Sequence, residues 1–311
     1  MDLIKKYFLN FLKGMAMGGA DIVPGVSGGS IALITGIYST LLESINSING
    51  KNLKLLLSLQ FKPFYKAING TFLLSLFAGI LTSVFTLSKL ITFLMEEHPV
   101  PLWSFFCGLI LISAFVILKD IRRWHLGVVL AIVIGIIVAY FITELPPVSS
   151  PEATWFTFLS GAIAICAMIL PGISGSFILL ILGKYETILT AVSERDIVTL
   201  AVFALGCMVG ILSFSRVISW LLKKYYATTI GLLAGFMLGS INKLWPWKLV
   251  TAYRTSSSGE EKPFLTENLW PAEYLEQVGK DPQLTSAIIA LLVGIFLVVG
   301  IDRLAAHFNK S

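Results

Sequence analysis

Pro24-Gly25-Val26-Ser27-Gly28-Gly29-Ser30 interrupts an apolar segment near the N-terminus, and Pro171-Gly172-Ile173-Ser174-Gly175-Ser176 interrupts another in the second half. When residues 14–42 are aligned with residues 161–189, a shift of 147 positions without a gap, 14 of the 29 positions are identical. Proline removes a backbone donor and glycine frees the backbone, so a helix should break at each copy. Paired breaks of this kind are typical of membrane transporters with internal repeats.

The composition indicates a membrane protein. The chain has 311 residues, of which 56% are hydrophobic and 13% are charged, and its mean hydropathy is +0.85. A soluble domain of this length could not bury so much apolar surface, so lipid must be the main solvent. Cys107, Cys166 and Cys207 lie in apolar runs without metal-like spacing, and we interpret them as buried thiols.

We expect an all-α polytopic membrane protein with two inverted-topology repeats, residues 1–148 and 149–311, each a re-entrant helical hairpin plus three transmembrane helices. The first repeat has its hairpin at 8–46 and spans at 72–95, 102–118 and 126–143. The second has its hairpin at 155–192, spans at 197–222, 228–245 and 284–301, and an extracytoplasmic loop at 246–282.

The first hairpin is expected to have two arms. The arm before Pro24 should be about a dozen residues, or about 18 Å of helix, which is too short to cross ~30 Å of hydrocarbon. The second arm should start near Ser27 and run to about Ser44, so that the hairpin consists of two helices. The chain would then dip into the membrane and return to the same side.

Parity and charge predict the orientation. Three spans per half is an odd number, so the second half should enter from the opposite face. In this scheme 14 of the 23 Lys and Arg residues fall on one side, and the three short loops on the other side hold only Arg195. The positive-inside rule then places both termini in the cytoplasm. The loop at 246–282 falls outside, either as a small cap on the membrane surface or as a disordered segment.

The two hairpin tips are the candidate binding site. Each tip ends one helix and begins another, and the N-terminus of a helix offers free amides with partial positive charge. Together with serine hydroxyls, such ends suit an anion, phosphate in particular. The alternative is that the glycines only permit tight packing. The candidate residues are Gly25, Ser27, Gly28, Gly29, Ser30, Gly172, Ser174, Gly175 and Ser176.

Three ionisable groups inside the apolar segments are further candidates. Lys89 and Arg216 are predicted to lie in opposite leaflets and to receive an anionic head group, unless they only extend to the nearest interface. Asp21 corresponds to Met168 in the second copy, and such an asymmetric carboxylate suits coupling to H⁺ or Na⁺. It could equally cap amides or pair with a lysine.

The sequence shows few of the residue patterns that are typical of enzymes. His98, His125 and His307 fall in loops or the tail, without metal spacing or a nucleophile–base pair, and Gly28-Gly29 lacks the Lys-Ser/Thr of a nucleotide-binding loop. We therefore expect no catalytic residue, no metal, no cofactor and no nucleic-acid partner. This chain should move a substrate rather than convert it.

The two motifs resemble a known family. Gly18-Gly19-Ala20-Asp21-Ile22-Val23-Pro24-Gly25-Val26-Ser27-Gly28-Gly29, paired with Leu170-Pro171-Gly172-Ile173-Ser174-Gly175, is similar to the bacterial polyprenyl-phosphate transporter family (PopT). The resemblance covers nearly the whole chain. It implies a translocase, or flippase, in the cytoplasmic membrane that returns undecaprenyl phosphate from the outer to the inner leaflet, recycling the carrier lipid for peptidoglycan and other envelope polymers. It assigns no role to residues 246–282.

Two rival functions stay open at the level of sequence. A secondary transporter of a small soluble anion would need a closed aqueous path without a lateral opening to lipid. An intramembrane lipid phosphatase would release inorganic phosphate, although the chain lacks a visible base or metal set for that reaction. The sequence does not indicate the oligomeric state.

Overall fold

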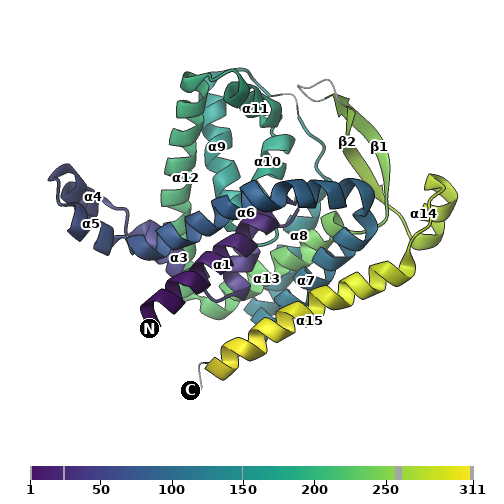
Figure 1. The fold of residues 1–311 in the computed structure, drawn as a ribbon, viewed down its shortest axis with the longest axis horizontal. Coiled ribbons are helices and arrows are strands. Elements are labelled where there is room, and N and C mark those ends of the chain that lie inside the picture. The colour runs from purple at the N-terminus through teal and green to yellow at the C-terminus, as the bar shows by residue number, and fades with distance from the viewer. Residues whose placement is uncertain (1, 24, 149, 256–260, 309–311) are drawn as a thin grey trace.

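Six long apolar helices dominate the structure, a computed structural model that describes residues 2–23, 25–148, 150–255 and 261–308 (Figure 1). They agree with the six predicted spans, and the protein is therefore a multi-pass membrane protein. They are α6 (Gly70–Glu97), α7 (Pro99–Lys119), α8 (Leu126–Glu144), α12 (Ile197–Lys224), α13 (Tyr226–Leu244) and α15 (Leu284–Phe308). Pro24, residues 256–260 and Lys310 lie outside the described residues.

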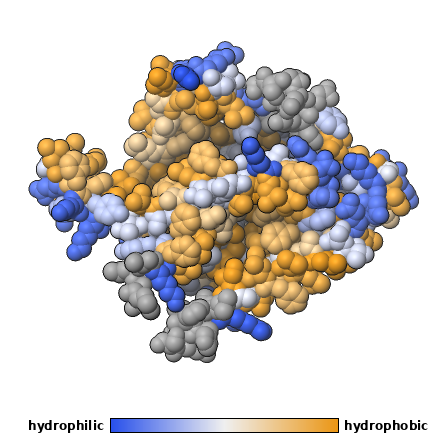
Figure 2. All heavy atoms as spheres, viewed as in Figure 1, coloured by the Kyte–Doolittle hydropathy of each residue, from blue (hydrophilic) through white to orange (hydrophobic). Residues whose placement is uncertain are grey.

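α6 and α15 expose apolar side chains, and Figure 2 shows such side chains over α15 at the lower right of the molecule. Phe77 and Phe85 of α6 and Ile289 and Phe296 of α15 are each more than half exposed. Burying apolar surface from water stabilises a protein by roughly 25 cal/mol per Å², so in water such faces would require a cover. The hydrocarbon of a bilayer supplies that cover without further protein.

The first hairpin begins with α1 (Asp2–Ile22), which is longer than predicted. It has 21 residues, and at 1.5 Å per residue it is about 31 Å long. The prediction of an arm too short to cross the hydrocarbon was therefore wrong. The helix continues through the polar N-terminal residues, which a search for apolar segments does not include.

The second arm of each hairpin is broken, which is another correction. In the first half it consists of α2 (Gly28–Ile34) and α3 (Tyr38–Asn46), and in the second of α10 (Gly175–Ile181) and α11 (Tyr185–Ser193). The breaks fall at the aligned Gly36 and Gly183, with φ of +71° and +64°. Helices do not continue through this left-handed conformation, which glycine adopts readily. The bend between α10 and α11 is 107°.

The two halves use equivalent helix contacts. α1 packs along α6, and α9 (Thr154–Ile169) packs along α12. A Cβ atom on Gly14 would lie 2.2 Å from the Leu76 carbonyl oxygen, and one on the aligned Gly161 would lie 2.5 Å from that of Phe203. α7 likewise packs on α15, and α8 on α13. These contacts agree with repeated units, whereas the opposed orientation of the halves stays a prediction.

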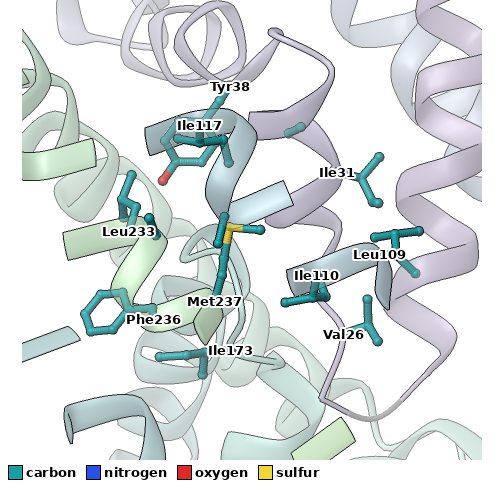
Figure 3. Close-up of a cluster of buried hydrophobic side chains, with 14 of the residues drawn as sticks. Val26, Ile31, Tyr38, Leu109, Ile110, Ile117, Ile173, Leu233, Phe236 and Met237 are labelled. Carbon is teal, nitrogen blue, oxygen red and sulfur yellow. The ribbon is translucent and has the colours of Figure 1, made fainter. Parts of the chain in front are cut away.

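The core lies where both tips meet α7 and α13. Val26 of the first tip and Ile173 of the second belong to one apolar cluster with Ile110, Leu233 and Met237, shown in Figure 3. All but Ile173 are fully buried, and Ile173 is 5% exposed. Both chain breaks are therefore held in the middle of the packed protein.

Two regions contain elements that the sequence analysis did not predict. Residues 47–69 form α4 (Gly50–Leu57) and α5 (Phe61–Ala67), which project from the body at the left of Figure 1. The loop at 246–282 contains the antiparallel strands β1 (Lys248–Thr255) and β2 (Glu261–Asn268), followed by α14 (Pro271–Val278). The Nε1 atoms of Trp245 and Trp247 donate to the carbonyls of Leu269 and Pro282, each at 2.8 Å. The described part of this loop is thus an ordered cap.

We expect Gly14→Ala to lower the thermal transition of the purified protein by several degrees. The added methyl group would force α1 away from the Leu76 carbonyl, and overpacking of this kind costs about 1–3 kcal/mol. Gly300→Ala in α15 is the matched control, because no atom lies within 4 Å of its Cβ position. Size-exclusion chromatography after heating measures both transitions. Equal transitions for the two variants would contradict the close α1–α6 contact.

Candidate functional site

The two hairpin tips lie in direct contact, although about 140 residues separate them in the sequence. The Ser27 hydroxyl lies 3.1 Å from the Met168 carbonyl oxygen and 3.2 Å from that of Leu170. In return, the Gly172 amide donates to the Ser30 hydroxyl at 2.9 Å. Ser27 and Ser30 are fully buried. The predicted serines of the first tip therefore bind the second hairpin.

Protein groups cap the helix that begins at the first tip. Ser27 is the N-cap of α2, and its hydroxyl accepts a hydrogen bond from the Gly29 amide at 3.1 Å. The Asp21 carboxylate accepts one from the Gly28 amide at 2.7 Å. Capping the first amides of a helix is the commonest use of Ser and Asp at such a position. Of the uses considered for Asp21, the structure displays the amide cap.

The second tip is less enclosed. Ser174 makes no capping hydrogen bond to α10, and its hydroxyl lies 2.8 Å from that of Ser176. Ser174 is buried, whereas Ser176 is exposed. Met168, which aligns with Asp21, supplies no carboxylate. The second tip therefore lacks the serine and carboxylate caps of the first, and its Ser176 is exposed.

The tip glycines permit close contacts. Gly25 and Gly172 have φ of +90° and +86°, a backbone conformation that other residues rarely adopt. A Cβ atom on Gly29 would lie 2.5 Å from the Ile169 carbonyl oxygen, and one on Gly175 would lie 2.7 Å from that of Ala164. The packing role considered for these glycines is thus present in the structure.

Two lysines near the tips escaped the sequence analysis. Lys243, in the last turn of α13, packs its aliphatic stem against Gly25, and its ammonium lies 4.7 Å from the centre of the Phe177 ring. Lys248 donates to the Lys243 carbonyl at 2.6 Å and lies 4.2 Å from the centre of the Trp103 ring. Lys243 ends an apolar span and Lys248 follows it, and lysine at such positions usually extends to the membrane interface. In the sequence, only the neighbouring tryptophans could have indicated another role.

The two predicted cations lie apart from this tip contact. Lys89 of α6 and Arg216 of α12 are exposed, and no hydrogen bond or ion pair joins either one to a tip among the described residues. Arg216 instead lines a groove with residues of α3 and α12. The structure therefore brings the tip residues together but leaves both cations at the periphery.

Comparison with protein families gives a match over residues 17–262 to the VCA0040-like family, described as undecaprenyl phosphate translocase-like. The chain belongs to this family. The match confirms the resemblance seen in the two glycine-rich motifs, and it includes both motifs.

Two curated relatives extend the comparison. A polyprenyl-phosphate transporter of Vibrio cholerae is 48% identical over 299 residues, which cover 96% of this chain and 97% of the relative. A polyprenyl-phosphate transporter of Staphylococcus aureus is 34% identical over 257 residues, which cover 77% of this chain and 86% of the relative. No solved structure matches the chain.

The pH dependence of stability should report on Lys248. Its burial, and then the nearby charge of Lys243, lower the pKa of Lys248 to about 7. A lysine in the unfolded chain has a pKa of about 10.4, so between about pH 7 and pH 10 only the unfolded state holds this proton. The contribution of Lys248 to stability therefore rises with pH across that window and is most unfavourable below it.

We expect Lys248→Met to remove this dependence. The thermal transition of the wild type should rise relative to that of the variant between pH 7 and pH 9.5, measured on purified protein in detergent. Lys280→Met, at an exposed lysine of the same cap, serves as the control and should follow the wild type at every pH. A constant difference between wild type and Lys248→Met would show that Lys248 stays charged.

Proposed function

We propose that this protein is a lipid-carrier translocase that moves undecaprenyl phosphate from the outer to the inner leaflet of the bacterial cytoplasmic membrane, so that the carrier is used again in cell-envelope synthesis. Membership of the undecaprenyl phosphate translocase-like family supports this proposal, as do two relatives named polyprenyl-phosphate transporter. The single structural observation that carries it is the contact between two broken-helix tips inside the apolar core.

The proposed orientation follows from the charges of the loops. The basic loops and both termini would face the cytoplasm, and the cap at 246–282 would face outward. In the view of Figure 1 the start of α1 and the end of α15 lie on the same side, away from β1, β2 and α14. An even number of crossings would give this arrangement. The two halves would then be inverted repeats whose tips approach from opposite faces.

On this proposal the phosphate head group passes the tips while the prenyl chain stays in lipid. The head group would move from the side of Lys89 to the tips and then to the side of Arg216. Ser174, Ser176 and the backbone of the second tip would offer donors, and the nearby Lys243 would offer positive charge. Passage requires the protein to open sideways between helices, because the tail remains attached to the head group.

Cells depleted of this protein, with other recycling transporters removed, should accumulate undecaprenyl phosphate in the outer leaflet. Labelling of the surface phosphate measures that level, and the wild-type gene should restore it. Ser27→Ala should restore it roughly tenfold less well at equal protein abundance, because the hydroxyl makes hydrogen bonds worth about 1 kcal/mol each. The exposed Ser58→Ala, between α4 and α5, is the matched control. An unchanged surface level after depletion would overturn the function.

We further expect transport to depend on Asp21. Protonation or ion binding at this carboxylate would weaken the hydrogen bond that it accepts from Gly28, and so would link an H⁺ or Na⁺ gradient to the first tip. Asp21→Asn keeps an acceptor oxygen but loses the charge. Its residual transport should no longer respond to a protonophore or to removal of Na⁺. A variant that still follows either gradient would exclude Asp21 as the coupling group.

A further inference from the structure

A basic groove lies where α3 meets α12, away from the hairpin tips. It has a volume of about 500 Å³ and is lined by Asn46, Arg216, Ser219, Trp220, Lys223 and Lys224. Arg216, Trp220 and Lys223 follow one another at intervals of four and three residues, which places them on one face of α12. The groove therefore combines three cations with an aromatic ring on one exposed strip of helix.

The positive charge in this groove is only partly balanced. Arg216 has no hydrogen-bond or ion-pair partner within the described part of the chain. Lys223 lies 3.7 Å from the carboxylate of Glu43, and both side chains are more than half exposed, so the pair contributes little stability. Lys224 lies 5.3 Å from the ring centre of Trp220. Three cations thus face one carboxylate.

The floor of the groove is a network of fixed hydrogen bonds. The Asn46 amide nitrogen donates to the Ser219 hydroxyl at 2.6 Å and lies 3.3 Å from the Ser215 carbonyl oxygen. The Ser215 hydroxyl donates to the Asn46 side-chain oxygen at 2.8 Å. Asn46, which also lines the groove, therefore joins the end of α3 to α12.

The other half of the protein does not repeat this junction. Ser193 aligns with Asn46, and its hydroxyl bonds within its own helix, to the Leu189 and Thr190 carbonyls. α3 packs firmly on α12, whereas α11 makes no comparable contact with α6 in the described structure. A basic groove over a polar junction is therefore a feature of one half, and the internal repeat alone does not explain it.

We infer that this groove binds the phosphomonoester head group of a lipid as it leaves the translocation path. The side of the membrane, and release as the event, rest on the proposed function. Arg216 would hold two phosphate oxygens with its planar guanidinium, and Lys223 would exchange Glu43 for the phosphate. Trp220 would lie at the level where head group and lipid tail meet, a common position for tryptophan.

The number and kind of charges favour a phosphomonoester. A monoester carries nearly two negative charges at neutral pH and three acceptor oxygens, as a phosphorylated side chain does. A phospholipid diester carries one charge and two free oxygens. Arg216 has no ion-pair partner among the described residues, and Lys223 has only an exposed pair with Glu43. Two positive charges can therefore bind the ligand, and they match the charge of a monoester better than that of a diester.

Native mass spectrometry of the purified full-length protein, titrated with undecaprenyl phosphate or with phosphatidylglycerol, tests this site. Arg216→Gln and Lys223→Gln should each weaken binding of undecaprenyl phosphate about tenfold, the usual effect of losing a charged hydrogen-bond donor. Glu43→Gln should strengthen it severalfold, because it frees Lys223. Arg122→Gln and Lys119→Gln, at exposed positions outside the groove, are the matched controls.

Three outcomes would overturn the site. Binding of undecaprenyl phosphate could be unchanged in both groove variants, Glu43→Gln could weaken it, or the variants could lower phosphatidylglycerol binding equally. The last result would identify a general contact for anionic lipids. Failure of the site is distinguishable from failure of the function, because depletion of the wild-type protein would still raise surface undecaprenyl phosphate.

Discussion

The hydrogen bonds between the two hairpin tips are the constraint on which the rest of the structure depends. A chain that breaks its helix inside an apolar environment must satisfy the freed backbone groups within the protein, because lipid offers no hydrogen bonds. Here each helix break provides hydrogen-bond partners for the backbone of the other break. Ser27 bonds to the carbonyls that end α9, and Ser30 accepts from the amide of Gly172. Each half therefore satisfies polar groups at the tip of the other half.

This mutual dependence explains where the glycines lie. Helices that carry the tips must approach closely, and Gly14 and Gly161 let α1 and α9 pack against the backbones of α6 and α12. The tips themselves differ, since Asp21 caps one helix and Met168 leaves the other without a carboxylate. The two halves thus hold one tip that a carboxylate caps and one tip without that cap, where Ser176 is exposed.

Hydropathy and internal repetition were sufficient to predict the six spans and the position of both breaks, because lipid-facing helices must be long and apolar and a Pro-Gly pair interrupts them. The second breaks at Gly36 and Gly183 were missed, since a single glycine in an apolar run is common in membrane helices. The sheet of β1 and β2 was missed because a search for spans ignores polar loops.

The candidate site was harder to predict than the spans. The tip residues followed from the repeated motif, but their contact is a tertiary pairing between distant segments, and local sequence does not specify it. Lys243 and Asn46 lacked a signal for the same reason. Lys243 contacts Gly25 and Phe177, and Asn46 forms hydrogen bonds with Ser215 and Ser219. All four partners are remote in sequence from the residue that they contact.

The difference between Asn46 and Ser193 would matter if the two halves of the proposed translocase close opposite sides of the membrane in turn. On the inverted-repeat scheme, moving closure from one side to the other requires α11 to approach α6 as α3 now approaches α12. Ser193 has a shorter side chain than Asn46 and already bonds to its own helix. A closure of α11 on α6 would therefore be held by fewer polar contacts than the contact of α3 with α12. A translocase built in this way would favour the state that is closed at α3 and α12, with its other side available to an incoming lipid.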